Sequence, residues 1–139
     1  MLIHSLLDPV DGSRCVLTFE EADHWLRATW RGYITAGEAQ HGASRYLEHV
    51  ASVRCAYLLN DNTELRGPWF DSVAWLEQAW LPHAVHLGLR YIAHVVQADT
   101  QVDILTLTLP QQVVGQLELQ LFYQVSEAEE WLRSCQGCR

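Results

Sequence analysis

The sequence predicts one α/β domain. It would hold a single, mostly parallel sheet with an N-terminal antiparallel hairpin and helices packed on it. Two alternating segments, 14–20 and 24–31, are joined by a short polar turn, and two continuous apolar runs, 55–59 and 89–96, follow. Segments with helical spacing separate the later strands, as in repeated β-α units with right-handed crossovers. The expected order is β-β-α-β-α-β-α-β-α.

The N-terminal hairpin is predicted from period-two alternation, which is typical of strands with one buried face. The polar residues 21–23 leave room only for a tight connection, so the two strands should be antiparallel. The apolar residues on the buried faces are Cys15, Leu17 and Phe19 in the first strand, and Leu26, Ala28 and Trp30 in the second.

The first helix should begin at a capping box, Thr35-Ala36-Gly37-Glu38, in which the Thr hydroxyl and the Glu carboxylate each bond a free backbone N–H. Its core-facing residues follow at helical spacing. They are Ala39, Ala43, Tyr46, Leu47 and Val50.

The central strands are predicted at 55–59 and 89–96, because runs that are apolar on both faces are typical of a parallel sheet. The first run should end at the turn Asn60-Asp61-Asn62. A further strand is expected at 117–123, whereas 102–114 fits either a helix or a strand.

The remaining helices are predicted from their start signals. Pro68 suits the first turn of a helix that carries Trp69, Val73, Leu76 and Trp80, and Pro82 should end or kink it. A second capping box, Ser126-Glu127-Ala128-Glu129, should open the last helix.

Composition limits the function classes. The chain has 139 residues, 49% hydrophobic and 19% charged, which suits one domain over 1–139 with a core at about 14–133 and a tail at 134–139. A net charge of −8 argues against nucleic acid and anionic membrane surfaces as partners. The apolar start at 1–7 is too short for a signal peptide, and no stretch approaches the length of a membrane span. We expect a cytoplasmic protein, because Cys15 and Cys55 fit buried thiols better than disulfides.

Several stretches, taken in order, resemble the SpoIIAA-like or STAS-type fold. More closely, they are similar to small bacterial STAS/SEC14-like domain proteins of uncharacterised function. The resemblance spans roughly residues 14–133. Its stretches are Trp30-Arg31-Gly32-Tyr33-Ile34-Thr35, Leu58-Leu59-Asn60-Asp61-Asn62, Gly67-Pro68-Trp69, Gly88-Leu89-Arg90-Tyr91-Ile92-Ala93-His94-Val95 and Ala128-Glu129-Glu130-Trp131-Leu132.

The resemblance implies a regulatory protein-binding module, a role that some STAS domains combine with a phosphorylation switch. The switch hydroxyl of those members lies where a strand meets the next helix. The corresponding segment here, 60–69, lacks their Asp-Ser-Ser-Gly pattern, and Thr63 is its only hydroxyl. A phosphorylation switch is therefore not expected.

The candidate interaction or ligand surface combines this segment with the helix that follows. Ligands of open α/β sheets bind at the carboxyl ends of strands, although Asn60, Asp61 and Asn62 also suit a simple Asx turn. Trp75 points away from the main apolar stripe of its helix, which fits either an interface or cover by a neighbouring element. The full set is Asn60, Asp61, Asn62, Thr63, Arg66, Trp69 and Trp75.

Two other motifs are weighed and set aside. His83 and His86 would share a helix face, but Pro82 disturbs their spacing and no third metal ligand is evident. Cys135 and Cys138 follow the carboxyl end of the last helix, where the dipole opposes thiolate formation, so a frayed tail is expected. We predict no catalytic residue, cofactor or metal.

Three functions remain open. The first is a non-enzymatic regulatory module that binds a protein partner, which could be a second copy of the chain. The second is a carrier of a small apolar ligand or lipid, with Trp30, Trp69 and Trp80 lining a cavity; a pocket well under about 300 Å³ would count against it. The third, least favoured, is an enzyme in which Asp61 converges with His94 or Arg66.

Overall fold

The computed structural model describes residues 2–7, 14–53, 55–66, 75–96 and 115–137. These residues contain one six-stranded sheet in the order β1-β2-β3-β4-β5-β6. The strands are β1 (Leu2–Leu7), β2 (Arg14–Glu20), β3 (Trp25–Tyr33), β4 (Tyr57–Arg66), β5 (Tyr91–Val95) and β6 (Glu118–Phe122). The helices are α1 (Ala36–Val53), the π-helical turn η2 (Leu76–Trp80), α3 (Leu81–His86) and α5 (Val125–Gly137).

The sheet is mixed, as predicted. β2 pairs antiparallel with β3, whereas the pairs β3–β4, β4–β5 and β5–β6 are parallel. The two apolar runs on which the prediction depends lie side by side, with Leu58 opposite Ile92. The sequence prediction missed β1, which adds an antiparallel strand beside β2.

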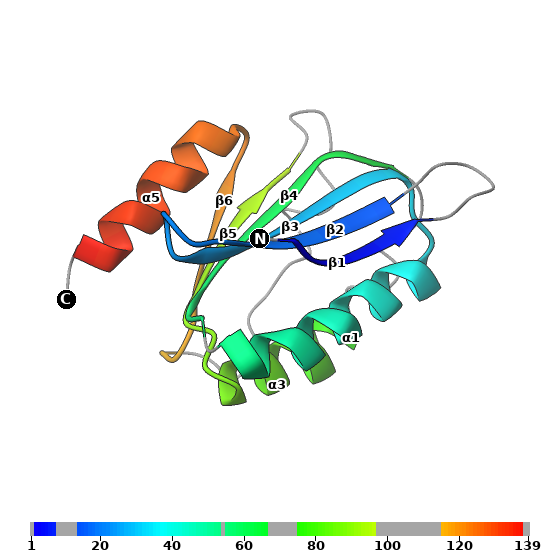
Figure 1. The fold of residues 1–139 in the computed structure, drawn as a ribbon, viewed down its shortest axis with the longest axis horizontal. Coiled ribbons are helices and arrows are strands. Elements are labelled where there is room, and N and C mark those ends of the chain that lie inside the picture. Colours follow the sequence, from blue (N-terminus) through cyan, green and yellow to red (C-terminus); the bar gives the residue numbers. More distant parts are fainter. Residues whose placement is uncertain (1, 8–13, 54, 67–74, 97–114, 138–139) are drawn as a thin grey trace.

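Helices cover both faces of the sheet (Figure 1). α1, η2 and α3 lie on one side, and α5 packs against β4, β5 and β6 on the other. Arg27 on β3 ties α5 to the sheet, since its guanidinium contacts both Glu20 and Glu129 at 2.6 Å. Between the layers lie fully buried side chains, including Trp25, Leu26, Leu59, Leu89, Val95 and Leu132.

The capping box at the start of α1 is confirmed. The amide of Glu38 donates to Thr35 Oγ1 at 3.2 Å, and the amide of Thr35 donates to Glu38 Oε1 at 3.0 Å. These bonds satisfy two backbone donors that the helix leaves free. α1 therefore begins where the sequence predicts, directly after β3.

The predicted turn at Asn60-Asp61-Asn62 is wrong, because these residues lie inside β4, which continues to Arg66. Its pairing with β3 shifts by one residue between Thr29 and Arg31. This bulge places one extra residue on β4, so both Asn62 and Leu65 are buried although they are three positions apart. Pairing with β3 on one side and β5 on the other supplies hydrogen bonds to the β4 backbone, and these outweigh the local preference of Asn and Asp for a turn.

Pro82 does not end its helix. The amide of Leu81 donates to the carbonyl of Leu76, five residues earlier, which widens the turn before the proline. Because proline lacks an N–H and its ring crowds the preceding turn, a π turn accommodates it without a break. The helix continues to His86.

The second predicted capping box is also wrong. Glu129 does not bond back to the start of α5, but accepts a hydrogen bond from Arg27 Nη2. A partner from a strand 102 residues away thus outcompetes the local one. The frayed tail predicted at 134–139 is wrong for its described part, because α5 continues to Gly137 and contains Cys135, which packs against the core. The ambiguous stretch 102–114, and also Trp69 and Cys138, lie outside the described residues.

Candidate functional site

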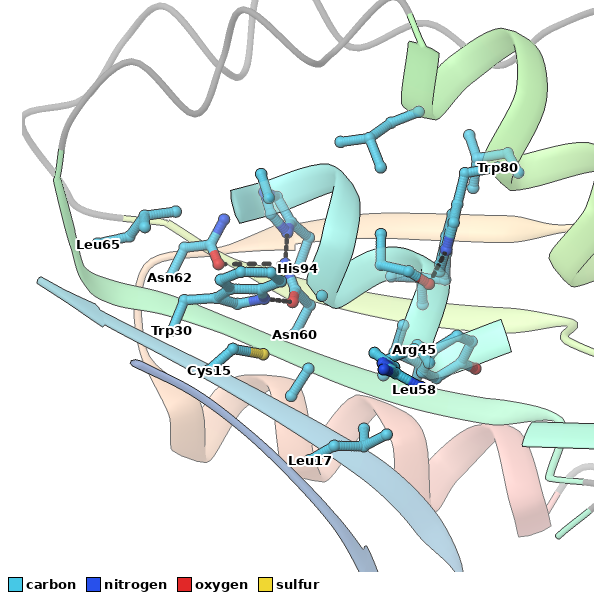
Figure 2. Close-up of a pocket in the computed structure, with 18 of the residues that line it drawn as sticks. Cys15, Leu17, Trp30, Arg45, Leu58, Asn60, Asn62, Leu65, Trp80 and His94 are labelled. Atoms are coloured by element: carbon cyan, nitrogen blue, oxygen red, sulfur yellow. Dashed lines mark hydrogen bonds between the residues drawn. The ribbon is translucent and has the colours of Figure 1, made fainter. Parts of the chain in front are cut away.

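A cavity of about 130 Å³ lies between the sheet and the helices α1, η2 and α3. Most of its wall is apolar, and a group of polar side chains lies on its sheet side (Figure 2). Sheet residues in the wall include Cys15, Leu17, Ala28, Trp30, Leu58, Asn60, Asn62, Leu65, Ile92, His94 and Leu119. Helix residues in the wall are Ala39, Gly42, Ala43, Arg45, Tyr46, Leu76, Trp80 and Leu81.

Strand register brings the polar residues together. Asn60 on β4 is paired with His94 on β5 and with Ala28 on β3. Side chains of paired residues in a sheet point to the same face. Asn60 and His94 therefore project side by side toward α1, and the alternation of β3 adds Trp30 to the same face.

Asn60 is the centre of a hydrogen-bonded cluster (Figure 2). Its Oδ1 accepts from Trp30 Nε1 at 3.0 Å. Its Nδ2 lies 3.3 Å from Asn62 Oδ1 and 2.9 Å from His94 Nδ1. One amide thereby links three side chains from three strands, and both of its N–H donors are used.

Close packing holds the Trp30 indole between the sheet and α1. A methyl carbon built on Gly42 would press on Cη2 of this ring and lie 3.1 Å from Cζ3. Glycine at this position therefore lets the helix approach the indole. On the other side of the cavity, Trp80 Nε1 donates to the carbonyl of Ala43 at 2.7 Å, which anchors η2 to α1.

Burial keeps three titratable side chains of the cavity wall uncharged. Desolvation lowers the pKa of His94 to about 4, so the imidazole is neutral at pH 7. Desolvation also raises the pKa of the Cys15 thiol to about 12, which leaves it protonated. The buried Tyr46 likewise has a raised pKa, and its hydroxyl forms no hydrogen bond within the described part of the chain.

Comparison with solved structures identifies this architecture. The chain is similar to an uncharacterised protein of the DUF3478 family from Shewanella loihica PV-4, which has a SpoIIAA-like fold. The TM-score is 0.53 with 18% sequence identity, over 91% of this chain and 98% of that one. This chain has a SpoIIAA-like fold. No protein-family model matches the sequence, and no curated protein matches it.

The SpoIIAA-like sheet separates the residues of the predicted surface. Asn60 and Asn62 face the cavity. Asp61 is paired with Thr29 and Val95, so it points to the opposite face, and its Oδ1 accepts from the amide and hydroxyl of Thr63 at 3.0 and 2.7 Å. The convergence of Asp61 with His94 that the enzyme hypothesis requires is therefore not found.

The other two described members lie at the margins. Arg66 is exposed at the end of β4, and Trp75 is half-buried against the hydrophobic core. Of the tryptophans assigned to a carrier cavity, Trp30 and Trp80 do line it. Gly42 and Cys15 are cavity residues that the sequence pattern did not predict, and His94 was predicted only as a partner of Asp61 in an enzyme. The available signal for His94 was a polar side chain inside an apolar strand.

Two general features bear on function. Within the five described ranges, no group of three or more metal-ligating side chains gathers in one place. The helices of these ranges are all too short or too polar to cross a bilayer.

Proposed function

We propose that this chain is a non-enzymatic binding module that takes one small, mostly apolar molecule into the cavity between the sheet and α1. The observation that carries the proposal is the polar cluster at the wall of an otherwise apolar cavity. Ligand sites commonly combine apolar walls with a few placed polar groups. A side-chain core alone has no use for three polar residues at these positions.

The size of the cavity favours a small ligand. A cavity of about 150 Å³ in another protein holds one benzene ring, and the volume here is about 130 Å³. Drug-sized ligands and lipids occupy pockets of roughly 300 Å³ or more. The cavity is well below this size, which counts against the carrier hypothesis as first framed and against a lipid. The proposal made here is narrower, because it concerns a ligand of about one ring.

The chemistry of the wall supports binding without catalysis. Cys15 is held as a thiol, and His94 stays neutral far below pH 7. None of the cavity-lining residues that the structure describes is a carboxylate. A general acid–base pair needs groups whose pKa values lie near the working pH, and this wall does not supply them.

Titration with toluene, followed by the indole N–H resonances, tests the proposal. Trp30 and Trp80 line the cavity, whereas Trp25 lies on the other face of the sheet and bonds Glu20. We expect saturable shifts of the first two signals and a constant Trp25 signal. Absence of saturable shifts would contradict the proposed function.

A matched pair of variants locates the site. Ala28→Leu adds a larger side chain to the cavity wall, and Ala22→Leu makes the same change at an exposed turn. Toluene should no longer shift the indole signals in Ala28→Leu, and should shift them normally in Ala22→Leu. A dispersed Trp25 signal reports that each variant is folded. Equal binding by both variants would place the ligand elsewhere.

A STAS-type protein-interaction module is the second candidate function. The SpoIIAA-like fold supports it, together with two exposed aromatic residues, Tyr33 and Tyr123, at 54% and 56% exposure. The buried, unpaired thiols of Cys15 and Cys55 suit a cytoplasmic location for such a module. Analytical ultracentrifugation of the wild type and of Tyr33→Ser tests for a homodimer. If both proteins sediment as monomers at every concentration, self-association is excluded.

A further inference from the structure

The contact with Trp30 fixes which atoms donate and which accept throughout the hydrogen-bonded cluster. An indole Nε1–H can only donate, so the Asn60 atom that it contacts at 3.0 Å must be the oxygen. The amide nitrogen of Asn60 then points at its two other neighbours. It donates to Asn62 Oδ1 at 3.3 Å and to His94 Nδ1 at 2.9 Å.

This assignment of donors and acceptors leaves two groups without an acceptor, the N–H of His94 and the NH₂ of Asn62. Because His94 Nδ1 accepts, the neutral imidazole carries its proton on Nε2. Because Asn62 Oδ1 accepts, its Nδ2 keeps both hydrogens. Within the part of the chain that the structure describes, neither group donates a hydrogen bond, although Asn62 is 4% and His94 9% exposed. Asn62 and His94 both line the cavity, so these two N–H groups are available to an acceptor inside it.

The remaining wall limits the charge of that acceptor. Arg45 is the only charged residue among the described lining residues, and it pairs with Glu48 at 2.8 Å with 43% of its side chain exposed. Among the described lining residues, the only positive charge is therefore already paired with a carboxylate. An anion placed against the buried donors would lose its hydration with only neutral N–H groups in return, which is unfavourable.

We propose that the cavity selects an uncharged molecule with one apolar ring and one carbonyl oxygen, which accepts hydrogen bonds from Asn62 Nδ2 and His94 Nε2. This inference rests on the proposed function and adds the class of ligand to it. The volume of about 130 Å³ admits a single six-membered ring with a short substituent. A site whose buried donors are left unpaired discriminates against analogues that lack the acceptor.

Two isosteric ligands test the inference on the unmodified protein. Acetophenone carries a carbonyl oxygen, and α-methylstyrene carries a methylene group in its place. NMR titration should give acetophenone the tighter binding by about tenfold or more, as expected for two hydrogen bonds. Its carbonyl carbon resonance should also move downfield on binding.

The other outcomes are distinguishable. Equal affinities would overturn the inference and leave the proposed function standing. Binding of neither compound would overturn both. Tighter binding of benzoate than of acetophenone would overturn the uncharged ligand class and point to Arg45.

A variant pair assigns the preference to the cluster. Asn62→Leu removes one donor, and Leu65→Met changes the same wall without touching the cluster. The affinity ratio of acetophenone to α-methylstyrene should fall at least about threefold in Asn62→Leu and stay unchanged in Leu65→Met. Because the ratio cancels general losses of affinity, an unchanged ratio in Asn62→Leu would exclude this residue from recognition.

Discussion

Alanine in place of Gly42 should destabilise the protein, although the same change normally stabilises a helix. Gly42 is buried in the middle of α1, against the Trp30 ring. In an ordinary helix interior, alanine is favoured over glycine by about 1 kcal/mol. Here the added methyl group would lie 3.1 Å and 3.2 Å from Cζ3 and Cζ2 of Trp30 and still closer to Cη2.

The loss of stability can be estimated from the packing and the hydrogen bond that the Trp30 indole would lose. Overpacking a well-filled region costs about 1–3 kcal/mol. A displaced indole also loses its hydrogen bond to Asn60, and a buried group left unpaired costs about 1–3 kcal/mol. After the helix-propensity gain of about 1 kcal/mol is subtracted, we expect Gly42→Ala to lower the free energy of unfolding by about 3 kcal/mol.

Gly37→Ala is the matched control in the first turn of the same helix. The nearest atom to a methyl group there is Thr35 Oγ1 at 4.0 Å, so the added carbon meets no obstacle. This variant should be as stable as the wild type or more stable by about 0.5–1 kcal/mol. Urea unfolding of the three proteins provides the comparison, and the Trp30 indole N–H resonance reports the lost hydrogen bond. If Gly42→Ala were as stable as Gly37→Ala with its indole signal unmoved, the account of this contact would be refuted.

Three further predictions concern single side chains. Tyr46→Phe should raise the unfolding free energy by about 1 kcal/mol in thermal or urea unfolding, because its buried hydroxyl has no partner among the described residues; a loss of stability would show that the hydroxyl is bonded. The free energy of unfolding should fall by about 3 kcal/mol between pH 6.5 and pH 4 because of His94. Its pKa is about 4 in the folded state and 6.5 in the free side chain, so only the unfolded chain takes up a proton in this range. A His94→Gln variant should lose this part of the pH dependence, and an unchanged slope would contradict the prediction. Glu129→Gln should lower the free energy of unfolding, measured in urea, by about 1 kcal/mol because it weakens the contact with Arg27. Glu130→Gln, at an exposed neighbouring position, should cause no measurable change. Equal values for the two variants would show that the ion pair does not stabilise the protein.

The parts of the fold that the sequence predicts well are those governed by short-range effects. Alternation over 14–20 needs only one buried face, and the capping box of Thr35 and Glu38 needs only neighbours three residues apart. The parts it predicts poorly depend on distant partners. Glu129 bonds Arg27 on another element, and Asn60 stays in a strand because strands on both sides complete its pairing.

The candidate site was harder to predict because the alignment of neighbouring strands brings its residues together. Asn60 and His94 become neighbours only when β4 and β5 pair in their observed alignment, and a shift of one residue would turn one of them to the opposite face. The bulge of β4 then adds Leu65 to the same wall as Asn62. The sequence could mark Asn60 and Asn62 as unusual, but their preference for turns led to the wrong local structure.

Three departures from ordinary packing meet at the same cavity. A helix has a glycine in its middle at Gly42, a strand has a bulge beside Asn62, and adjacent parallel strands place Asn60 and His94 where apolar side chains are usual. Each departure costs stability, and apolar residues of similar volume in place of Asn60 and His94 would avoid that part of the cost. In folded proteins, such departures concentrate at functional sites. Their meeting around one small cavity therefore favours ligand recognition over an accident of core packing.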